Sequence, residues 1–356
     1  MKYDVIHFEA LGEESSHLEL STKEAQKNGL LPNELNYVIT PLNLQEYMAQ
    51  NPDTVLPDII TTKTHSHLPE EYLKGNKKSV ITRSAGYDHF EMYADIANVT
   101  SLREYCVNAV AQTAIKFLYD TAGYLNHYTV NTSTFERNKT TSFMELNKQR
   151  TATVFGVGKI GKRIYDLLVA NGLTTQAVDI RQDELSQLYG GNVNFVTKEE
   201  AIKNSDIIIN AMNLTRLENS RFYNVNYFSE ELLANAKDGI IFINVTRGEI
   251  APESTLMKYY KSGKIIGIGV DVFSDESGFS NVLNGKTDTV SENHKAALEM
   301  LEGAMSRREN IYVQPHQAFN SDVAVISKAD ETLKHIVAWY KNDKKKFDSQ
   351  LPYYSI

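Results

Sequence analysis

Val154-Phe155-Gly156-Val157-Gly158-Lys159-Ile160-Gly161 places three glycines between a predicted strand, residues 151–155, and a predicted helix, residues 159–170. In that setting Gly156 permits a sharp turn, Gly158 lets the backbone approach a pyrophosphate, and Gly161 lets helix and strand pack closely. The helix N-terminus offers unpaired N–H groups to phosphates. We therefore predict a dinucleotide-binding α/β domain around this segment.

The next predicted strand, residues 175–179, ends in Asp179, 18 residues beyond Gly161. A carboxylate at this place can accept hydrogen bonds from both ribose hydroxyls of NAD. It would also repel the 2′-phosphate of NADP, although Arg181 nearby leaves some tolerance for that phosphate. The spacing therefore predicts NAD as the cofactor.

Short β-branched runs alternate with helical stretches along the rest of the chain, which is typical of a parallel sheet covered by helices. We predict helices at 22–28, 106–124 and 323–341 and a polar surface loop at 131–148. The remaining predicted strands are 3–8, 36–39, 58–61, 79–82, 193–196, 206–210, 240–244, 265–271 and 311–314.

The composition narrows the function classes. The chain has 356 residues, 42% of them hydrophobic, and a net charge of −8, which argues against a general nucleic-acid binder. A single cysteine, Cys106, suits a reducing cytoplasm. The N-terminal run resembles a first strand and not a signal peptide, and we expect no membrane span. His65 and His67 alternate without a further ligand, so we predict no metal site.

Three polar residues follow predicted strands of the nucleotide domain, where open α/β sheets bind ligands: Arg247, Glu276 and His316. A guanidinium can bind a carboxylate through two hydrogen bonds and polarise a neighbouring carbonyl. An imidazolium can donate a proton as hydride reaches C2 of a 2-oxo acid. A carboxylate beside the histidine holds its tautomer and favours its charged form. Together these groups predict 2-oxo acid reduction.

The chain resembles the D-isomer-specific 2-hydroxyacid dehydrogenase family, and within it the D-lactate dehydrogenase branch. The resemblance covers nearly the whole length. Its motifs are Arg83-Ser84-Ala85-Gly86-Tyr87-Asp88, Tyr105-Cys106-Val107-Asn108-Ala109-Val110-Ala111, the glycine fingerprint, 244–248, 269–273 and Pro315-His316-Gln317-Ala318-Phe319. The ending Pro-His-Gln-Ala-Phe and the long segment 280–310 before it favour the lactate branch.

The resemblance implies roles for individual residues. Arg247, Glu276 and His316 would be the catalytic trio, while Ala85 and Gly86 would hold the substrate carboxylate through their backbone. Tyr105 and Phe319 would line the substrate's side-chain pocket. Cofactor contacts are implied for Val110, Gly156, Gly158, Lys159, Ile160, Gly161, Asp179, Met212, Asn213, Val245, Thr246 and Asp271, of which Val110 would back the nicotinamide ring and Asp271 would contact its amide.

The fold class that follows is α/β, with two doubly wound parallel-sheet domains and a cleft between them. Residues 105–314 would form a Rossmann NAD domain, and residues 1–104 with 315–356 a flavodoxin-like substrate domain. We expect an NAD-dependent enzyme that interconverts a small 2-oxo acid and its D-2-hydroxy acid, pyruvate and D-lactate being the pair that the branch implies. The family also implies a homodimer.

Two alternatives remain open. The substrate could be a different 2-oxo acid, such as 2-oxoisocaproate, glyoxylate or hydroxypyruvate. Outside enzymology, the chain could be an NADH sensor similar to the family's transcriptional corepressors.

Overall fold

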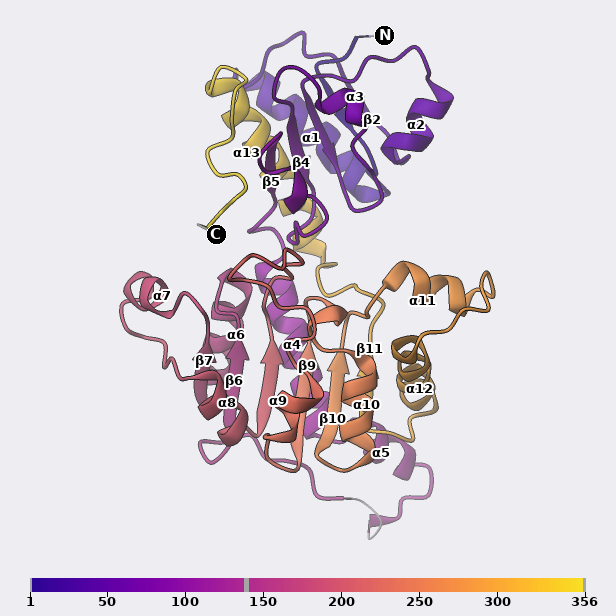
Figure 1. Cartoon of the computed structure of the whole chain (residues 1–356), viewed down its shortest axis with the longest axis vertical. Helices are drawn as coiled ribbons and strands as arrows, with labels where there is room; N and C mark the ends of the chain where they lie inside the picture. Colours follow the sequence, from indigo (N-terminus) through magenta and orange to yellow (C-terminus); the bar gives the residue numbers. More distant parts are fainter. Residues whose placement is uncertain (1, 138–140, 355–356) are drawn as a thin grey trace. The chain divides into compact units, whose positions relative to one another are not determined.

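The computed structural model describes residues 2–137 and 141–354 of the chain (Figure 1). The chain divides into two compact units. Unit 1 contains the residues up to Cys106 together with those from Asn320 onward, and unit 2 is Val107–Phe319.

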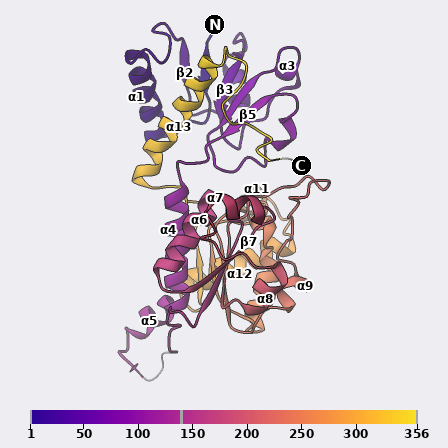
Figure 2. The same ribbon diagram turned by 90° about the vertical axis from the view of Figure 1, so that its left-hand side faces the viewer.

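Unit 1 is built on a parallel sheet whose five strands, among the described residues, run in the order β2-β1-β3-β4-β5. Its helices α1 and α13 lie side by side (Figure 2). The elements are β1 (Val5–His7), α1 (Glu13–Lys27), β2 (Tyr37–Ile39), α2 (Leu44–Gln50), β3 (Ile59–Thr62), α3 (Glu70–Leu73), β4 (Ser79–Thr82), the 3₁₀ turn η1 (Glu91–Tyr93), β5 (Asn98–Ser101) and α13 (Asp322–Lys341).

Unit 2 has a parallel sheet whose described strands run in the order β11-β10-β9-β8-β6-β7. Its elements are α4 (Val107–Ala122), α5 (Leu125–Asn131), β6 (Thr151–Phe155), α6 (Lys159–Ala170), β7 (Thr174–Val178), α7 (Gln182–Leu188), α8 (Lys198–Asn204), β8 (Ile207–Asn210), α9 (Glu230–Ala234), β9 (Ile240–Asn244), η3 (Gly248–Ile250), α10 (Glu253–Lys261), β10 (Ile265–Val270), α11 (Glu276–Leu283), α12 (Glu292–Ser306) and β11 (Ile311–Val313).

The central strands β8 and β9 of unit 2 are apolar up to the asparagine that ends each of them, because helices cover both faces of the sheet. Every residue of β8 and β9 is buried. Helix α4 packs against β9, β10 and β11, and Figure 1 shows it behind the sheet, with α9 and α10 in front. The two parallel-sheet α/β domains confirm the predicted fold class. Because all these strands are parallel, the carboxyl ends of β6 to β11 share one edge, and the predicted catalytic residues Arg247, Glu276 and His316 follow strands that end there.

The structure differs from the predicted elements at three places. Residues 98–101 form strand β5, which the sequence did not suggest, and the first helix begins at Glu13 and not at residue 22. Residues 193–196 are not a strand, since only Phe195 makes an isolated bridge, to Ala177. After α5, the described part of the predicted loop 131–148 contains no strand and no α-helix, and residues 138–140 lie outside the described residues.

In the part of the chain that the structure describes, no helix combines the length and the apolar character that a bilayer crossing requires.

Candidate active site

The three glycines of the fingerprint each have a distinct steric reason. Gly156 has a φ of +83°, and a Cβ on it would lie 2.7 Å from the backbone of Met212. A Cβ on Gly161 would lie 1.8 Å from the carbonyl oxygen of Gly156, so only glycine allows α6 to begin this close to β6. Gly158 caps α6, and nothing lies within 4 Å of a Cβ built there. The loop therefore leaves open space at the N-terminus of a 12-residue helix, where phosphates bind well.

Asp179 follows β7 and is tied to the fingerprint loop. Its Oδ2 accepts a hydrogen bond from the backbone N–H of Val157 at 2.8 Å, and its Oδ1 accepts one from the N–H of Arg181 at 2.9 Å. The guanidinium of Arg181 lies 3.9 Å from Asp179 and 3.3 Å from Glu184. A carboxylate has about four acceptor positions, so Asp179 retains capacity for ribose hydroxyls.

Two buried asparagines at the ends of β8 and β9 connect the next loops. The Nδ2 of Asn210 donates to the Oδ1 of Asn244 at 3.0 Å and to the Oγ1 of Thr246 at 2.9 Å. Asn210 Oδ1 accepts from the N–H of Met212, and Asn244 Nδ2 donates to the carbonyl of Arg247. Sequence reasoning missed Asn210, although an asparagine at each of two neighbouring strand ends was a usable signal.

His316 and Glu276 are brought into direct contact from different segments. The Nδ1 of His316 lies 2.8 Å from the Oε2 of Glu276, while Glu276 Oε1 accepts from the N–H of Phe273 at 3.3 Å. Burial opposes ionisation of Glu276. The hydrogen bond and charge of His316, the Phe273 N–H and the charge of Arg247 outweigh burial and lower the pKa of Glu276. The carboxylate is therefore anionic at neutral pH.

Backbone conformation fixes both members of this pair. Asp275, directly before Glu276, has a φ of +45°, and His316 itself has a φ of +52°. Left-handed backbone at a non-glycine residue costs free energy and persists where surrounding contacts impose it. At His316 such a contact is the hydrogen bond from its N–H to the carbonyl of Asp271, 2.7 Å long. At Asp275 it is the side chain, which caps α11 by accepting from the N–H of Gly278.

Asp271 is completely buried and holds the segment that carries the histidine. Its two carboxylate oxygens accept hydrogen bonds from the N–H groups of Gln317 and Ala318, each 2.9 Å long. Burial raises the pKa of Asp271, and these two hydrogen bonds oppose that rise. The observed role of Asp271 is thus to anchor 316–318, and its predicted contact to the nicotinamide amide stays a prediction.

Arg247 lies after β9, and its Nη1 donates to the carbonyl of Thr246 at 2.9 Å. The next residue, Gly248, packs directly against the chain that leads to Glu276. A Cβ on Gly248 would lie 2.1 Å from the carbonyl carbon of Phe273 and from the nitrogen of Ser274. The glycine therefore brings the Arg247 loop and the Glu276 loop together.

The other predicted residues of unit 2 are distributed along the same strand ends. Phe319 makes an edge contact with His316, with ring centroids 6.2 Å apart. Val110 is buried in α4 and Val245 after β9, whereas Ile160 and Met212 are half-buried and Lys159 and Asn213 are exposed.

Unit 1 holds the remaining predicted residues. Ala85 and Gly86 lie half-buried in the loop after β4, where Ser84 Oγ donates to the Gly86 carbonyl at 2.7 Å. Tyr105 is buried, and its N–H donates to Glu331 at 2.9 Å. Their predicted role in substrate binding stays a prediction.

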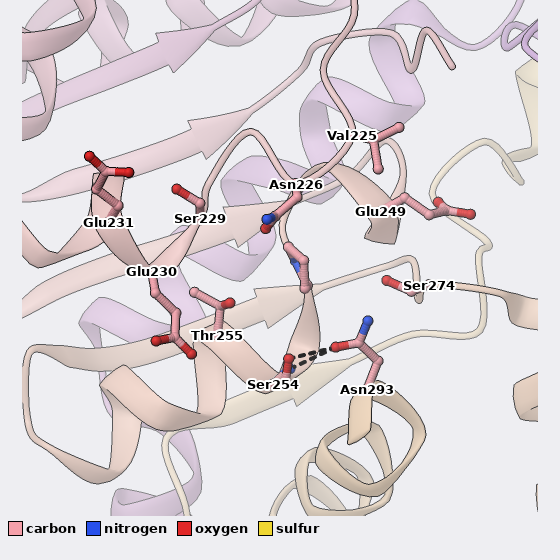
Figure 3. A pocket seen from close by; sticks show the side chains of 11 residues that line it. Val225, Asn226, Ser229, Glu230, Glu231, Glu249, Ser254, Thr255, Ser274 and Asn293 are labelled. Atoms are coloured by element: carbon pink, nitrogen blue, oxygen red, sulfur yellow. Dashed lines mark hydrogen bonds between the residues drawn. The ribbon is translucent and has the colours of Figure 1, made fainter. Parts of the chain in front are cut away.

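Away from these residues, a hollow of about 600 Å³ lies beside the start of α9 and α10 (Figure 3). Glu230, Glu231 and Glu249 line it together with Ser254 and Asn293, which hydrogen-bond at 2.6 Å. Glu230 pairs with Lys258 and Glu249 with Arg216. None of the predicted site residues lines this hollow, and Glu230 and Glu249 already have cationic partners.

Within residues 2–137 and 141–354, the structure contains no group of three or more histidine, cysteine, aspartate or glutamate side chains suited to a metal ion.

Comparison with known proteins gives the family. Residues 120–318 match the family model described as "D-isomer specific 2-hydroxyacid dehydrogenase, NAD binding domain". The chain belongs to this family. The predicted family is therefore confirmed, and so is NAD as the cofactor of the domain that residues 120–318 form.

Individual relatives are distant. An aromatic 2-oxoacid reductase of Clostridium sporogenes is 27% identical over 52% of this chain and 51% of its own length. A D-lactate/D-glycerate dehydrogenase of Pediococcus acidilactici is 28% identical over 51% of this chain and 50% of its own. The chain thus spans about half the length of these curated relatives. The crystal structure of a D-lactate dehydrogenase from Aquifex aeolicus, complexed with NAD and lactic acid, superposes with a TM-score of 0.78 at 22% identity, covering 99% of this chain and 100% of that one.

Proposed function

We propose that this protein is an NAD-dependent oxidoreductase that interconverts a small 2-oxo acid and its D-2-hydroxy acid, with pyruvate and D-lactate as the pair. The observation that carries the proposal is the 2.8 Å contact between His316 Nδ1 and Glu276 Oε2 at the strand ends of a dinucleotide domain. Family membership and the D-lactate dehydrogenases among the similar proteins support it.

The residues of unit 2 fit a dinucleotide. Gly158 leaves open space at the N-terminus of α6 for phosphates, and Asp179 offers acceptors to ribose hydroxyls. Val110 would lie behind the nicotinamide. The binding surface would be completed by Lys159, Ile160, Met212, Asn213, Val245 and Thr246. When bound, the cofactor supplies a hydride for the keto carbon or accepts one from the hydroxy acid.

We assign the proton transfer of the reaction to His316. With Nδ1 hydrogen-bonded to the anionic Glu276, the proton to be exchanged is held at Nε2. In reduction Nε2 donates this proton to the keto oxygen, and in oxidation it accepts one from the hydroxyl. Glu276 keeps the ring oriented and stabilises its charged form, whereas Asp271 fixes the backbone that carries it.

We assign the binding of the substrate's negatively charged carboxylate to Arg247. Its guanidinium can hold the carboxylate through two hydrogen bonds and stabilise negative charge that develops on the keto oxygen. The backbone at Ala85 and Gly86 would contribute further donors to the carboxylate. Tyr105 and Phe319 would contact the substrate's side chain, which begins at C3, and their bulk favours the single methyl group of pyruvate over branched chains.

The experiment that tests the proposal is NADH oxidation measured against a panel of 2-oxo acids. The panel contains pyruvate, glyoxylate, hydroxypyruvate, 2-oxoisocaproate and phenylpyruvate, the last because a relative is named an aromatic 2-oxoacid reductase. A higher kcat/KM with pyruvate than with any other acid of the panel supports the proposal. Turnover with none of the panel contradicts it.

We also propose a cytoplasmic homodimer. Large apolar side chains are exposed on and beside α4 and α5, among them Tyr119, Leu125, Val130 and Phe143, which are between 47% and 56% exposed. Where such side chains adjoin one another, a second copy of the chain can bury them. Light scattering should give twice the chain mass, and Phe143→Asp should lower it toward that of a monomer.

A further inference from the structure

A second buried carboxylate, that of Glu253 at the start of α10, contacts the loop that leads to Glu276. Its Oε1 accepts a hydrogen bond from the backbone N–H of Ser274, 2.6 Å long. Glu253 is only 3% exposed. Burying a carboxylate costs free energy unless hydrogen bonds compensate for the lost water. The proposed function gives Glu253 no role so far, and its contact with this loop suggests one.

Two successive N–H groups of the loop donate to two different carboxylates. The N–H of Phe273 donates to Glu276 Oε1 at 3.3 Å. The N–H of the next residue, Ser274, donates to Glu253. The other oxygen of Glu276, Oε2, lies 2.8 Å from Nδ1 of His316. A displacement of residues 273–274 would therefore change the position from which Glu276 contacts His316.

The same hydrogen bond connects this loop to the segment that carries Arg247. The 3₁₀ turn η3 directly follows Arg247, and α10 begins shortly after it at Glu253. A Cβ on Gly248, the first residue of η3, would lie 2.1 Å from the backbone nitrogen of Ser274. The two segments thus pack against each other at Gly248, and the carboxylate of Glu253 joins them by a hydrogen bond.

The hydrogen bond does not depend on the charge of Glu253. Burial raises the pKa of Glu253, the hydrogen bond from the Ser274 N–H opposes that rise, and the charge of Glu249 adds to it. A carboxyl group accepts hydrogen bonds in its ionised form and retains acceptor capacity when it is protonated. The position of the side chain therefore decides whether the loop is held, and its protonation state does not.

We infer that Glu253 is a positioning residue, which accepts the N–H of Ser274 and so fixes the loop from which Glu276 contacts His316. The inference rests on the proposed function and goes beyond it, since Glu253 acts through the backbone of residues 273–276. Without this hydrogen bond Glu276 would be less well held beside His316. Its negative charge would then favour the imidazolium less.

Glu253→Ala removes the acceptor and tests the inference directly. In pyruvate reduction kcat should fall by about one to two orders of magnitude, because a small misplacement of a catalytic group can reduce the rate by about 100-fold. The activity should also be lost at a lower pH than that of the wild type, since the imidazolium is less stabilised. The affinity for NADH, measured by fluorescence titration, should change little.

Two conservative variants separate the reach of the side chain from its charge. Glu253→Gln keeps an acceptor oxygen at the same distance from the backbone, so it should restore most of kcat and the wild-type pH profile. Glu253→Asp keeps the carboxylate but is one methylene group shorter, so its pH profile should resemble that of Glu253→Ala.

Asn310→Ala is the matched control for a loss of stability. Asn310 is 3% exposed, and its Nδ2 donates to the carbonyls of Thr121 and Ile266. Its removal also leaves buried backbone groups unpaired, but it precedes β11, at the amino end of that strand. The variant should lower the melting temperature and leave the pH profile of reduction unchanged.

Two results would overturn the inference. One is a folded Glu253→Ala variant with the kcat and pH profile of the wild type. The other applies if Glu253→Ala does not fold, and it is the same pH profile in Glu253→Asp and Glu253→Gln.

A measurement without turnover distinguishes this inference from the proposed function. The ring signal of His316 can be followed against pH by NMR and assigned through its absence in His316→Gln. Its titration should change in the same direction in Glu253→Ala as in Glu276→Gln, and it should not change in Asn310→Ala. If no 2-oxo acid is reduced but this pattern holds, the proposed reaction fails and the positioning role stands. If pyruvate is reduced and the signal titrates alike in Glu253→Ala and the wild type, the reaction stands and the positioning role fails.

Discussion

The carboxylate of Asp179 accepts a hydrogen bond from the backbone N–H of Val157, 2.8 Å long, and so joins the end of β7 to the middle of the glycine fingerprint. Asp179, which would bind the ribose hydroxyls, is thereby fixed relative to the loop that would bind the pyrophosphate. Arg181, the cation closest to it in the sequence, is engaged by Asp179 and Glu184. This arrangement favours a ribose hydroxyl over a phosphate.

We therefore expect NADH to be preferred over NADPH by at least about tenfold in kcat/KM, which corresponds to about 1.4 kcal/mol. Asp179→Ser should narrow the difference, since the repelling carboxylate is gone and Arg181 can meet the 2′-phosphate. Asp183→Ser, at an exposed position of α7, is the control and should change nothing. Steady-state kinetics with both cofactors checks the expectation, and equal efficiency of the wild type with both would contradict it.

Arg247→Lys separates charge from geometry. The substitution keeps the positive charge and loses the planar fork that binds a carboxylate through two hydrogen bonds. We expect kcat/KM for pyruvate to fall by about two to three orders of magnitude, with both KM and kcat affected. NADH affinity, measured by fluorescence titration, should change little.

Arg216→Lys is the matched control, because Arg216 is exposed and pairs with Glu249. Normal turnover in Arg247→Lys would show that another cation binds the substrate carboxylate.

Phe319→Ala tests the size of the pocket. Phe319 packs edge-on against His316, so removing its ring should open space next to the proposed proton donor. The wild type should have a higher kcat/KM for pyruvate than for 2-oxoisocaproate. In the variant, the ratio of these two values should shift toward 2-oxoisocaproate by about one order of magnitude, the usual effect of one or two methylene groups in an apolar pocket. If 2-oxoisocaproate is already the better substrate of the wild type, the assignment of Phe319 is wrong.

Asn210→Ala tests the link between β8 and β9. The side chain is completely buried and makes hydrogen bonds to Asn244, Thr246 and Met212. Its removal leaves buried polar partners unsatisfied, and we expect a loss of about 1–3 kcal/mol in the free energy of unfolding. NADH affinity should fall as well, since Met212 and Thr246 are predicted cofactor contacts. Denaturant titration of this variant and of the exposed control Asn284→Ala would show whether the loss is specific.

The sequence predicted the elements of unit 2 well because its strands are buried on both faces. Runs such as Ile207–Ile209 and Ile240–Ile243 are apolar without alternation and lie between turn residues. Strand β5 was missed because Asn98, Thr100 and Ser101 are polar. Segments distant in sequence satisfy them: Asn98 and Thr100 donate to the carbonyls of Lys345 and Ser349. Such tertiary partners leave no local signal.

In the candidate site, too, some features were visible in the sequence and others depend on tertiary contacts. The glycine spacing and the residues after strand ends were visible from local patterns. The anchoring of 316–318 by Asp271 was not, because it joins backbone N–H groups 46 and 47 residues away. Likewise, the steric need for Gly248 comes from Phe273 and Ser274, which only the fold brings next to it. Local patterns were enough to choose the candidate residues, whereas the contacts that position them come from the fold.

Under the proposed function, the His316–Glu276 pair should give the two directions of the reaction opposite dependence on pH. Reduction of the keto acid requires the imidazolium, so it should fall as pH rises; oxidation requires the neutral ring and should fall as pH drops. The pKa of Glu276 is lowered, so its carboxylate is charged at neutral pH, and a negative charge beside His316 favours the imidazolium. Glu276→Gln keeps size and hydrogen bonding but removes the charge.

Its reductive activity should therefore be lost at a lower pH than that of the wild type, with activity in acid largely kept. The oxidative profile should shift in the same direction, so that oxidation persists to lower pH. His316→Gln should reduce kcat by roughly two to four orders of magnitude, the usual contribution of a positioned acid, with NADH binding nearly intact. Initial rates in both directions across pH 5–10 provide the measurement. A Glu276→Gln profile that coincides with the wild type's would mean that the charge of Glu276 does not influence His316, and a different group would then have to stabilise the imidazolium.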